Sequence, residues 1–269
     1  MKIELNGEQL ETTEKTVLAL RNTIFGSKPG VVVILNGHQL NEDHPLSSGD
    51  EVFFIEKGVM PSQRQLEKMM AARHTPKVHD RVKQGKVAIA GLGGLGSNIA
   101  VALARIGVGS LLLVDFDVVE PSNLNRQSYY VEHLGRPKTE ALSEQLRKIN
   151  PYITIHAEQV KIDETNANRL FEGYGIVCEA FDSPKEKAML INTLLTSRSD
   201  VKIVAASGLA GYESANTIRT DRKLKNLYVC GDGENEARPG RGLMAPRVLV
   251  CAGHQATMVL RLLMCIEDV

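Results

Sequence analysis

A glycine-rich stretch at residues 91–96 is the first feature of this sequence that indicates chemistry. It reads Gly-Leu-Gly-Gly-Leu-Gly, directly follows the apolar run 87–90 and precedes an apolar helical pattern. Glycines at this spacing let the backbone turn tightly and approach a phosphate, which then lies against the free N–H groups at the helix start. The alternative is a tight strand-to-helix turn with no ligand. The glycines expected to bind a nucleotide are Gly91, Gly93, Gly94 and Gly96.

An acidic residue ends the next apolar run, at 111–114. Asp115 stands 19 residues after Gly96, where an acidic side chain accepts hydrogen bonds from ribose hydroxyls. Asp117 could bind the nucleotide as well or be only a turn residue. A dinucleotide-dependent dehydrogenase fits this much of the sequence equally well, so residues further along must decide between nucleotides.

Arg126 and Lys138 would bring positive charge to such a nucleotide. Lys138 follows Pro137, which marks the first turn of a helix, and a lysine there opposes the helix dipole unless an anion lies nearby. Arg126 stands beside Asn123 and Gln127 and offers a planar fork for phosphate oxygens. Each cation could instead be an ordinary solvated charge.

Asp182 follows the apolar run 176–180, which places it at the edge of the sheet where ligands collect. With Ser183 and Pro184 it could also cap the helix expected over 185–196.

These stretches together resemble the ThiF/MoeB adenylyltransferases, relatives of the ubiquitin-activating enzymes. The resemblance runs from Lys86 to the C-terminus and rests on GLGGLGS at 91–97, DFD at 115–117, SNLNRQ at 122–127, GRPK at 135–138 and the distal Asp182. It implies ATP and Mg²⁺ as cofactors. The roles that it implies are adenosine binding by Gly94 and Asp115 and phosphate binding by Asn123, Arg126 and Lys138, while Asp182 binds magnesium or shapes its site.

The chemistry of that family fits the residues. A carboxylate that attacks the α-phosphorus of ATP is already deprotonated at neutral pH, so the step needs no general base and charge neutralisation becomes the main catalytic task. We therefore expect Arg126, Lys138 and Asp182 to be the catalytic residues.

The cysteines depart from the family pattern. Many relatives bind a structural zinc through two CxxC pairs, whereas this chain has four cysteines and no CxxC pair, so we expect no zinc. Some relatives use a loop cysteine to form a covalent link with their carrier protein. Cys230 is the candidate for such a reactive thiol, and a plain semi-buried thiol is the alternative.

The resemblance also implies a homodimer in which an N-terminal arginine of one subunit reaches the ATP of the other. Arg73 is the candidate for this arginine, with Arg64 and Arg81 as alternatives.

From Lys86 onward, apolar strands alternate with helical stretches. The expected strands are 87–90, 111–114, 153–156, 176–180 and 201–206, and the expected helices are 97–106, 138–149, 164–171 and 185–196. This alternation predicts an α/β, Rossmann-like fold with a mainly parallel sheet and helices on both faces, and with ligands at the carboxyl ends of the strands. The loop 231–242, rich in Gly and charged residues, is expected to be mobile.

Residues 1–59 form a separate pattern. Two Asn-Gly dipeptides, at 6–7 and 36–37, predict hairpins around a helix at 14–25, which indicates a small β-grasp, ubiquitin-like domain. This unit resembles ThiS, the sulfur carrier that ThiF enzymes activate. A carrier must end in a free Gly-Gly carboxylate, but here the chain continues beyond Gly58. We expect a docking or regulatory module, then a helical connector at 60–85 that packs on the larger domain after it, and an adenylyltransferase domain at 86–269.

Composition excludes several classes of protein. Hydrophobic residues make up 43% and charged residues 24% of the 269, as in ordinary globular proteins. Because 32 basic residues balance 32 acidic ones, no net charge attracts nucleic acid or a membrane surface. The start of the chain lacks the apolar core of a signal peptide, so a cytoplasmic location is expected.

The function that these features favour is adenylation of the C-terminal glycine of a separate ThiS-like carrier, for thiazole synthesis in the thiamine pathway. Adenylation of another carboxylate, on a tRNA or a molybdopterin-type carrier, stays open as an alternative. So do an NAD-dependent oxidoreductase and a non-catalytic ATP-binding interaction protein.

Overall fold

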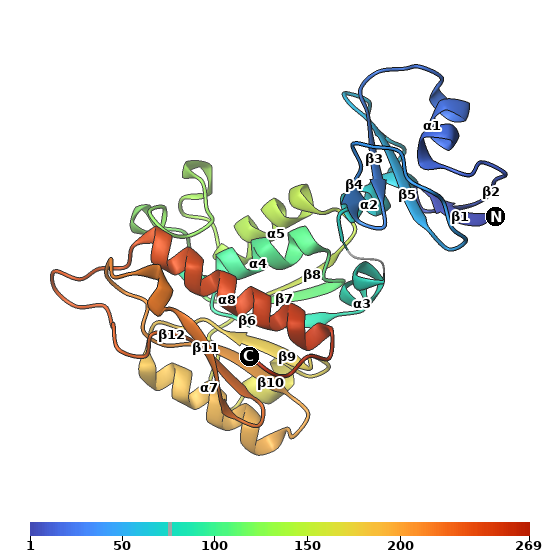
Figure 1. Ribbon diagram of the computed structural model, residues 1–269. Helices are drawn as coiled ribbons and strands as arrows, with labels where there is room; N and C mark the ends of the chain where they lie inside the picture. The colour runs from blue at the N-terminus through green and yellow to red at the C-terminus, as the bar shows by residue number, and fades with distance from the viewer. Residues whose placement is uncertain (75–76) are drawn as a thin grey trace. The chain divides into compact units, whose positions relative to one another are not determined.

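The chain folds into two compact units, Met1–Asp80 and Arg81–Val269 (Figure 1). The computed structural model describes residues 1–74 and 77–269, with the side chains of residues 63 and 64 left out.

The first unit is built on a five-stranded sheet, with the helix α1 on one of its faces. The strands lie in the order β2 (Glu8–Glu11), β1 (Lys2–Leu5), β5 (Glu51–Glu56), β3 (Val31–Leu35) and β4 (His38–Gln39). The pair β1–β5 is parallel and the other pairs are antiparallel. Asn6 and Asn36 have φ angles of 50° and 49°, as tight Asn-Gly hairpin turns require. The predicted ubiquitin-like unit is confirmed.

The helix α1 (Val17–Phe25) begins three residues later than predicted, because Thr16 is its N-cap. The Thr16 hydroxyl accepts a hydrogen bond from the Ala19 N–H at 3.2 Å and so satisfies one of the free donors of the first turn. Val17 and Leu20 of α1 are buried against one face of the sheet.

The opposite face of this sheet is covered by the connector. The stretch expected to be one helical connector contains two short helices, α2 (Gln63–Met70) and α3 (Val78–Lys83). Met69 and Ala72 pack on Ile34 and Phe53, which β3 and β5 present on the face away from α1. The expectation that the connector packs on the larger domain is therefore wrong for α2, because alternation along two apolar strands leaves a second hydrophobic face to bury.

The second unit contains a seven-stranded sheet in the order β11-β12-β10-β9-β6-β7-β8. The strands are β6 (Lys86–Ala90), β7 (Ser110–Asp115), β8 (Thr154–Gln159), β9 (Ile176–Glu179), β10 (Lys202–Ala206), β11 (Arg219–Leu224) and β12 (Leu227–Gly231). All neighbours are parallel except β11, which runs antiparallel to β12. The predicted α/β class is confirmed, although the last two strands were not predicted.

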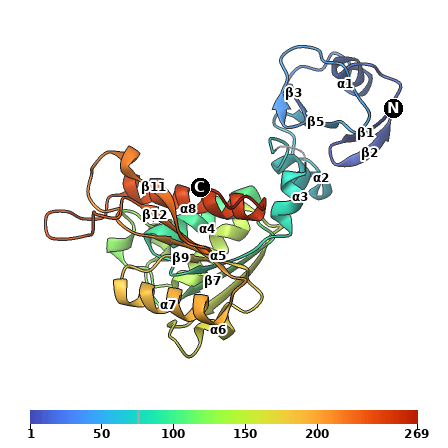
Figure 2. The same ribbon diagram turned by 60° about the horizontal axis from the view of Figure 1, so that its bottom comes forward.

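Helices cover both faces of this sheet (Figures 1 and 2). The helices α4 (Gly94–Ile106), α5 (Lys138–Ile149) and α8 (Ala245–Leu263) lie on one face, with α4 between the other two. On the other face α6 (Ala167–Leu170) packs beside α7 (Pro184–Ser197), over a core that includes Phe171, Leu190 and Leu194. Three short 3₁₀ turns, Pro121–Asn123, Val131–His133 and Ala215–Thr217, lie in the loops.

The strand order fixes where a ligand can bind. From β6 the chain proceeds to β7 and β8 on one side, and then crosses to β9 on the other side of β6. The loops that leave β6 and β9 therefore diverge, and they leave a crevice at the carboxyl ends of these strands.

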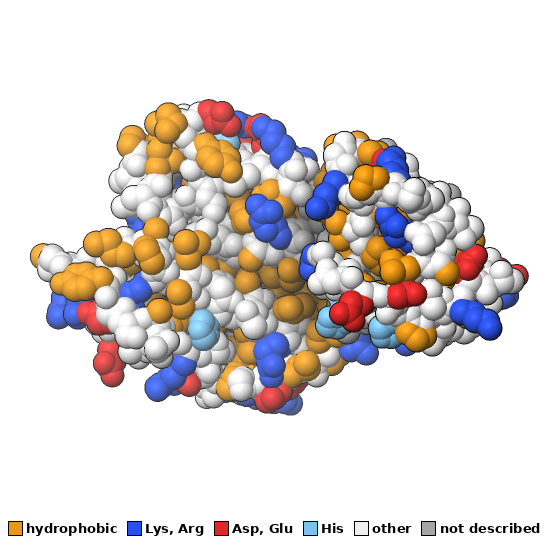
Figure 3. All heavy atoms as spheres, turned by 45° about the horizontal axis from the view of Figure 1, so that its top comes forward, with side chains coloured by type: hydrophobic (Ala, Val, Ile, Leu, Met, Phe, Trp, Pro, Cys, Tyr) orange, Lys and Arg blue, Asp and Glu red, His pale blue; other side chains and the backbone are white. Residues whose placement is uncertain are grey.

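The distribution of charged side chains on the surface agrees with the balanced composition. Lys and Arg side chains are interspersed with Asp and Glu on the face drawn in Figure 3. No helix among the described residues combines the length and hydropathy that crossing a membrane requires.

Candidate functional site

A cleft of about 660 Å³ opens at this crevice. The predicted residues that line it are Gly91, Gly93, Gly94, Asp115, Asp117, Asn123, Arg126, Lys138 and Asp182. Gly96 lies behind the loop, in the contact between α4 and β6. The structure thus brings together nearly all of the side chains that the sequence singled out, from the ends of β6, β7 and β9 and from the start of α5.

The glycine loop has little room for side chains at Gly91 and Gly96. Gly91 has a φ of 89°, and a Cβ at Gly96 would stand 1.9 Å from the Gly91 carbonyl oxygen. The helix α4 begins at Gly94, and the preceding Gly93 provides no side-chain cap. The N–H groups of the first helical turn therefore lack acceptors within the helix and remain free for an anion.

Asp115 holds this loop while it faces the cleft. Its Oδ2 accepts the Leu92 N–H at 2.6 Å and its Oδ1 accepts the Asp117 N–H at 2.8 Å. Burial raises the pKa of Asp115, since the side chain is only 8% exposed, and these two backbone hydrogen bonds counter part of the effect. Each carboxylate oxygen keeps a second lone pair, so the residue can still accept a ribose hydroxyl.

Lys138 is not a solvated side chain. It is 6% exposed, and its Nζ lies 2.9 Å from Oδ2 of Asp117. Asp117 thus orients the lysine at the first position of α5, where the positive end of the helix dipole adds to the lysine charge. This arrangement gives Asp117 a part in the site beyond that of a turn residue.

Arg126 lies against the glycine loop. An ideal Cβ on Gly94 would be 3.5 Å from Cγ of Arg126. Its Nη1 donates to the Ser122 carbonyl oxygen at 3.1 Å and to Oδ1 of Asn125 at 2.9 Å. Its Nε is buried and has no hydrogen-bond partner within the described part of the chain. Because a buried guanidinium donor without an acceptor is costly, the arrangement favours an anionic ligand at this position.

Asn123 has a structural task that the sequence did not reveal. Its Oδ1 accepts the Glu120 N–H at 3.0 Å as part of a reciprocal cap of the 3₁₀ turn. The side chain is 8% exposed and lines the cleft, so its amide NH₂ group remains available for a phosphate oxygen.

Asp182 is an exposed residue of the cleft. The cap of α7 is Ser183, whose hydroxyl accepts the Glu186 N–H, so the capping alternative applies to Ser183. No hydrogen bond or ion pair within residues 1–74 and 77–269 occupies the Asp182 carboxylate. A free carboxylate beside a phosphate site fits Mg²⁺, which binds largely through water and phosphate.

The structure adds residues that were missed. Phe116, 50% exposed, and Phe181 line the cleft with Lys161 and Lys187. Lys187 forms an ion pair with Glu179, whose side chain is fully buried. Burial raises the pKa of Glu179, and the Lys187 charge opposes this shift. A glutamate at the end of an otherwise apolar strand was the sequence signal for this pair.

Cys230 is fully buried on β12. Burial raises the pKa of its thiol to about 11, so the thiolate needed for a covalent link is scarce at neutral pH. Within the described residues, Cys230 does not line the cleft. This environment favours the plain buried thiol over the reactive one.

Among residues 1–74 and 77–269, no group of three or more His, Cys, Asp or Glu side chains is placed to hold a metal ion.

The arginines predicted to reach the ATP of the other subunit are distant in sequence from most of the cleft residues. Arg73 is exposed and donates a hydrogen bond to Gln39 of the first unit. Arg81 donates to the Met264 carbonyl oxygen at 3.3 Å. The side chain of Arg64 lies outside the described residues.

Comparison with known families identifies both parts of the chain. Residues 64–269 match the ThiF family, and residues 1–58 match the ThiS-like ubiquitin family. The molybdopterin-synthase adenylyltransferase of Salmonella typhimurium is 34% identical over 190 residues, which are 68% of this chain and 75% of that protein. The adenylyltransferase and sulfurtransferase UBA4 of Yarrowia lipolytica is 29% identical over 194 residues, and the match spans 68% of this chain but only 46% of UBA4.

Solved structures show the same fold. The E. coli tRNA N6-threonylcarbamoyladenosine dehydratase TcdA, in complex with ATP, aligns with a TM-score of 0.68 and 23% sequence identity. This alignment covers 77% of the present chain and 98% of TcdA.

Proposed function

This chain belongs to the ThiF family of adenylyltransferases, and we propose that it adenylates the C-terminal glycine carboxylate of a free ThiS-like sulfur carrier. The reaction consumes ATP with Mg²⁺, releases pyrophosphate and serves thiazole synthesis in the thiamine pathway. We place it in the cytoplasm, where ATP is available and the four cysteines, all unpaired, stay reduced.

One observation carries this proposal. Two cations, Lys138 and Arg126, line the same cleft as the open start of α4, and the Arg126 Nε is buried there without an acceptor among the described residues. A nicotinamide dehydrogenase has no need of such a cluster beyond its pyrophosphate loop. Transfer of an adenylyl group does, because charge develops on the α-phosphate and on the leaving pyrophosphate.

The step follows from these positions. A carboxylate oxygen attacks the α-phosphorus, the bond from that phosphorus to the oxygen bridging to the β-phosphate breaks, and pyrophosphate leaves with the electron pair. No proton moves in this step. Lys138, held by Asp117, and Arg126 neutralise the phosphate oxygens, while Asp115 accepts the ribose hydroxyls. Asp182, together with water, would hold Mg²⁺, which would supply further positive charge to the triphosphate.

The first unit indicates the class of substrate. A chain that carries its own ThiS-like domain is expected to act in the same pathway as free ThiS-like carriers. The fused domain is itself no substrate of this kind, because the backbone continues after Gly58 into α2, and α2 packs back on the sheet. We assign it a docking or regulatory role.

The test is pyrophosphate exchange into ATP, measured with Mg²⁺ in the presence and absence of a free carrier that ends in Gly-Gly. Exchange should depend on the carrier and should be lost in Lys138→Ala and in Arg126→Ala. Lys148→Ala is the matched control, since Lys148 lies on the same helix with a side chain that is 69% exposed. Exchange that survives both cleft substitutions would refute the site, and binding of NAD in place of ATP would refute the class of enzyme.

A homodimer in which Arg73 contacts the nucleotide of the second copy is the remaining part of the proposal. Arg73→Ala and Lys138→Ala should each be inactive alone, whereas a mixture should regain activity because some mixed dimers hold one intact site. No recovery after mixing, with dimers present by sedimentation, would argue against the trans arginine.

A further inference from the structure

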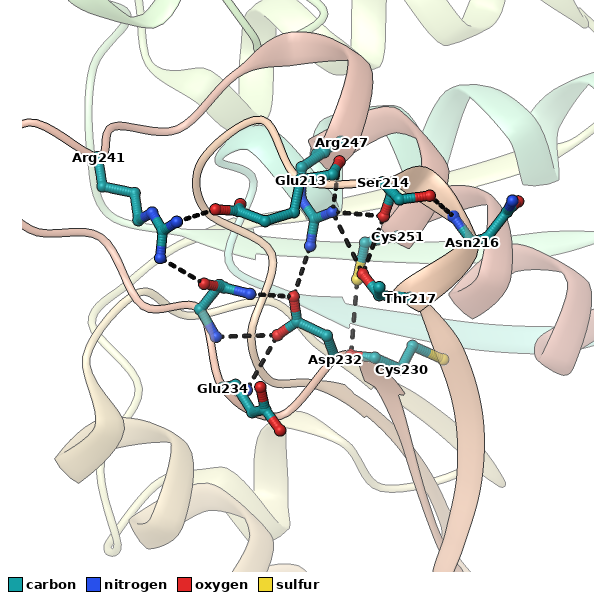
Figure 4. Close-up of polar contacts among 11 residues, drawn as sticks. Glu213, Ser214, Asn216, Thr217, Cys230, Asp232, Glu234, Arg241, Arg247 and Cys251 are labelled. Atoms are coloured by element: carbon teal, nitrogen blue, oxygen red, sulfur yellow. Dashed lines mark hydrogen bonds and ion pairs between the residues drawn. The ribbon is translucent and has the colours of Figure 1, made fainter.

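A network of charged and polar side chains connects the helix α8 with the loops around Glu213 and Asp232 (Figure 4). Arg247, near the start of α8, is 3% exposed. Its Nη2 lies 2.5 Å from Oδ2 of Asp232, and its Nη1 donates to the carbonyl oxygens of Glu213 and Ser214 at 2.9 and 2.8 Å. One guanidinium therefore joins α8 to two loops that are distant in sequence.

Asp232 belongs to the loop 231–242 and fixes the conformation of this loop through further hydrogen bonds. Its Oδ1 accepts the N–H groups of Glu234 and Asn235, both at 2.9 Å, and its Oδ2 accepts Nδ2 of Asn235 at 2.7 Å. Burial alone would raise the pKa of Asp232, but the hydrogen bonds from Asn235 and Glu234 and the charge of Arg247 outweigh it, so the net shift is downward. The carboxylate is thus ionised and fully engaged.

Asn235 completes the path to the cleft wall. Its carbonyl oxygen accepts the N–H groups of Leu209 and Ala210, at 3.0 and 2.9 Å. Its Oδ1 accepts Nη1 of Arg241 at 2.8 Å. Leu209, Ala210 and Asn235 all line the cleft. A continuous series of hydrogen bonds therefore runs from Arg247 through Asp232 and Asn235 to this wall, and the loop that the sequence suggested to be mobile is held at several points.

The close approach of the two loops supports a fixed geometry. Gly208 has a φ of 74°, and a Cβ there would stand 2.2 Å from Oδ1 of Asp232 and 2.5 Å from the Gly233 nitrogen. The loops are packed so closely that no side chain fits between them, and a small displacement of Asp232 must move the wall.

The strand order shows which part of the cleft this wall serves. The wall follows β10 and β12, whereas Asp115 ends β7 and Asp117 comes two residues later, and the strands β9 and β6 lie between β10 and β7 in the sheet. If ribose lies at Asp115 and the phosphates lie at the β6 loop, the wall faces the side from which a second substrate must reach the α-phosphorus.

We propose that Arg247 and Asp232 are positioning residues for the carboxylate substrate. Through Asn235 they hold Leu209 and Ala210 as the surface along which the extended acyl tail lies next to the phosphates. This inference rests on the proposed adenylation. It predicts that loosening the network impairs use of the carrier while ATP binding stays intact.

The decisive variant is Asp232→Asn combined with Arg247→Met. Removing both charges leaves no unpaired buried ion, so the variant should fold, yet the hydrogen bonds from Arg247 to both loops are lost. Arg247→Lys is the second variant, which keeps the charge but cannot span the same acceptors. The matched control is Arg219→Met with Asp221→Asn, an ion pair on β11 whose side chains are 69% and 36% exposed.

Three readouts separate positioning from folding. Glutamyl endopeptidase should cut after Glu234 and Glu236, both exposed, faster in the network variants than in the wild type. The ATP dissociation constant, measured by calorimetry, should stay at its wild-type value. Carrier-dependent pyrophosphate exchange should fall on the order of 100-fold in kcat/KM for the carrier, as expected for a misplacement of about 1 Å. The control pair should change none of these.

Several results would overturn the inference. Unchanged proteolysis would show that the network does not hold the loop, and near-normal exchange despite faster proteolysis would show that the position of the wall does not matter. An equal loss of ATP affinity would assign the network to the nucleotide. If the double variant fails to fold, the same outcomes are read from Arg247→Lys. Absence of carrier-dependent exchange in the wild type would instead refute the proposed function, and the proteolysis would still test whether the loop is held.

Discussion

Alanine substitutions in the glycine loop should separate its two tasks, which are close packing of α4 against β6 and binding of the nucleotide phosphates. The Cβ added in Gly96→Ala would stand 1.9 Å from the Gly91 carbonyl oxygen and 3.1 Å from Cγ2 of Ile89. Since ordinary contact begins at 3.4 Å, the first turn of α4 must retreat by the difference between 3.4 and 1.9 Å, about 1.5 Å. The obstacle is backbone, so no side-chain rotation relieves it.

The expected loss of stability follows from the cost of inserting a methyl group into a packed core. Such insertions cost about 1–3 kcal/mol, which lowers the melting temperature by roughly 2–12 °C for a domain of this size. Nucleotide affinity should fall as well, because the N–H groups of the first turn move away from the phosphates.

Gly93→Ala and Gly94→Ala are matched controls. A Cβ at Gly93 meets only Nε2 of Gln127, at 3.8 Å, and one at Gly94 meets Cγ1 of Val248 at 3.1 Å. Gly93→Ala should therefore keep the wild-type melting temperature but bind ATP more weakly, since Gly93 lines the cleft where the phosphates approach. Gly94→Ala should lie between the two, because a side chain can yield.

Circular dichroism and calorimetry with a non-hydrolysable ATP analogue would measure both quantities. A wild-type melting temperature for Gly96→Ala would refute the packing argument. Wild-type ATP affinity for Gly93→Ala would show that the phosphates do not lie on this loop.

Three further results are expected. Iodoacetamide at pH 8 should modify the exposed Cys265 in the folded protein and spare the buried Cys230, whose pKa of about 11 leaves little thiolate; equal labelling in intact-mass spectra would contradict this. Hydrogen bonds from Lys148 and Arg136 lower the pKa of Glu144 to about 2 from 4.5. Glu144→Gln should therefore melt at a lower temperature than the wild type above pH 4.5, and the difference between the two melting temperatures should vanish as the pH falls toward 2. Tyr129→Phe should cost about 1–2 kcal/mol in denaturant titrations, because the buried Tyr129 hydroxyl donates to the Leu92 carbonyl oxygen; an unchanged midpoint would contradict that role.

Local sequence signals predicted the parts of the fold that depend on neighbours in the chain. The Asn-Gly pairs specify hairpin turns through their own φ preferences, and the alternation of apolar strands with helices specifies a parallel sheet. The cleft residues Asp115, Lys138 and Asp182 were predictable for the same reason, because each lies near the end of an apolar strand or begins a helix.

Interactions between distant residues were not predictable in this way. Residues 219–224 read RTDRKL, with no apolar alternation, because β11 is an edge strand that pairs only with β12. The contact of Arg247 with Asp232 joins residues 15 positions apart and turned a loop expected to be mobile into a held one. A charged residue in sequence shows neither its burial nor its partner, so both required the structure.

The central claim is that this chain transfers an adenylyl group to a carboxylate. The most direct test is intact-mass spectrometry of a free Gly-Gly-ended carrier after incubation with the protein, ATP and Mg²⁺. The carrier should gain the mass of one adenylyl group, with pyrophosphate released, and a carrier lacking its last glycine should gain nothing. Release of ADP and phosphate, or an unmodified carrier when ATP is shown to be bound, would contradict the claim.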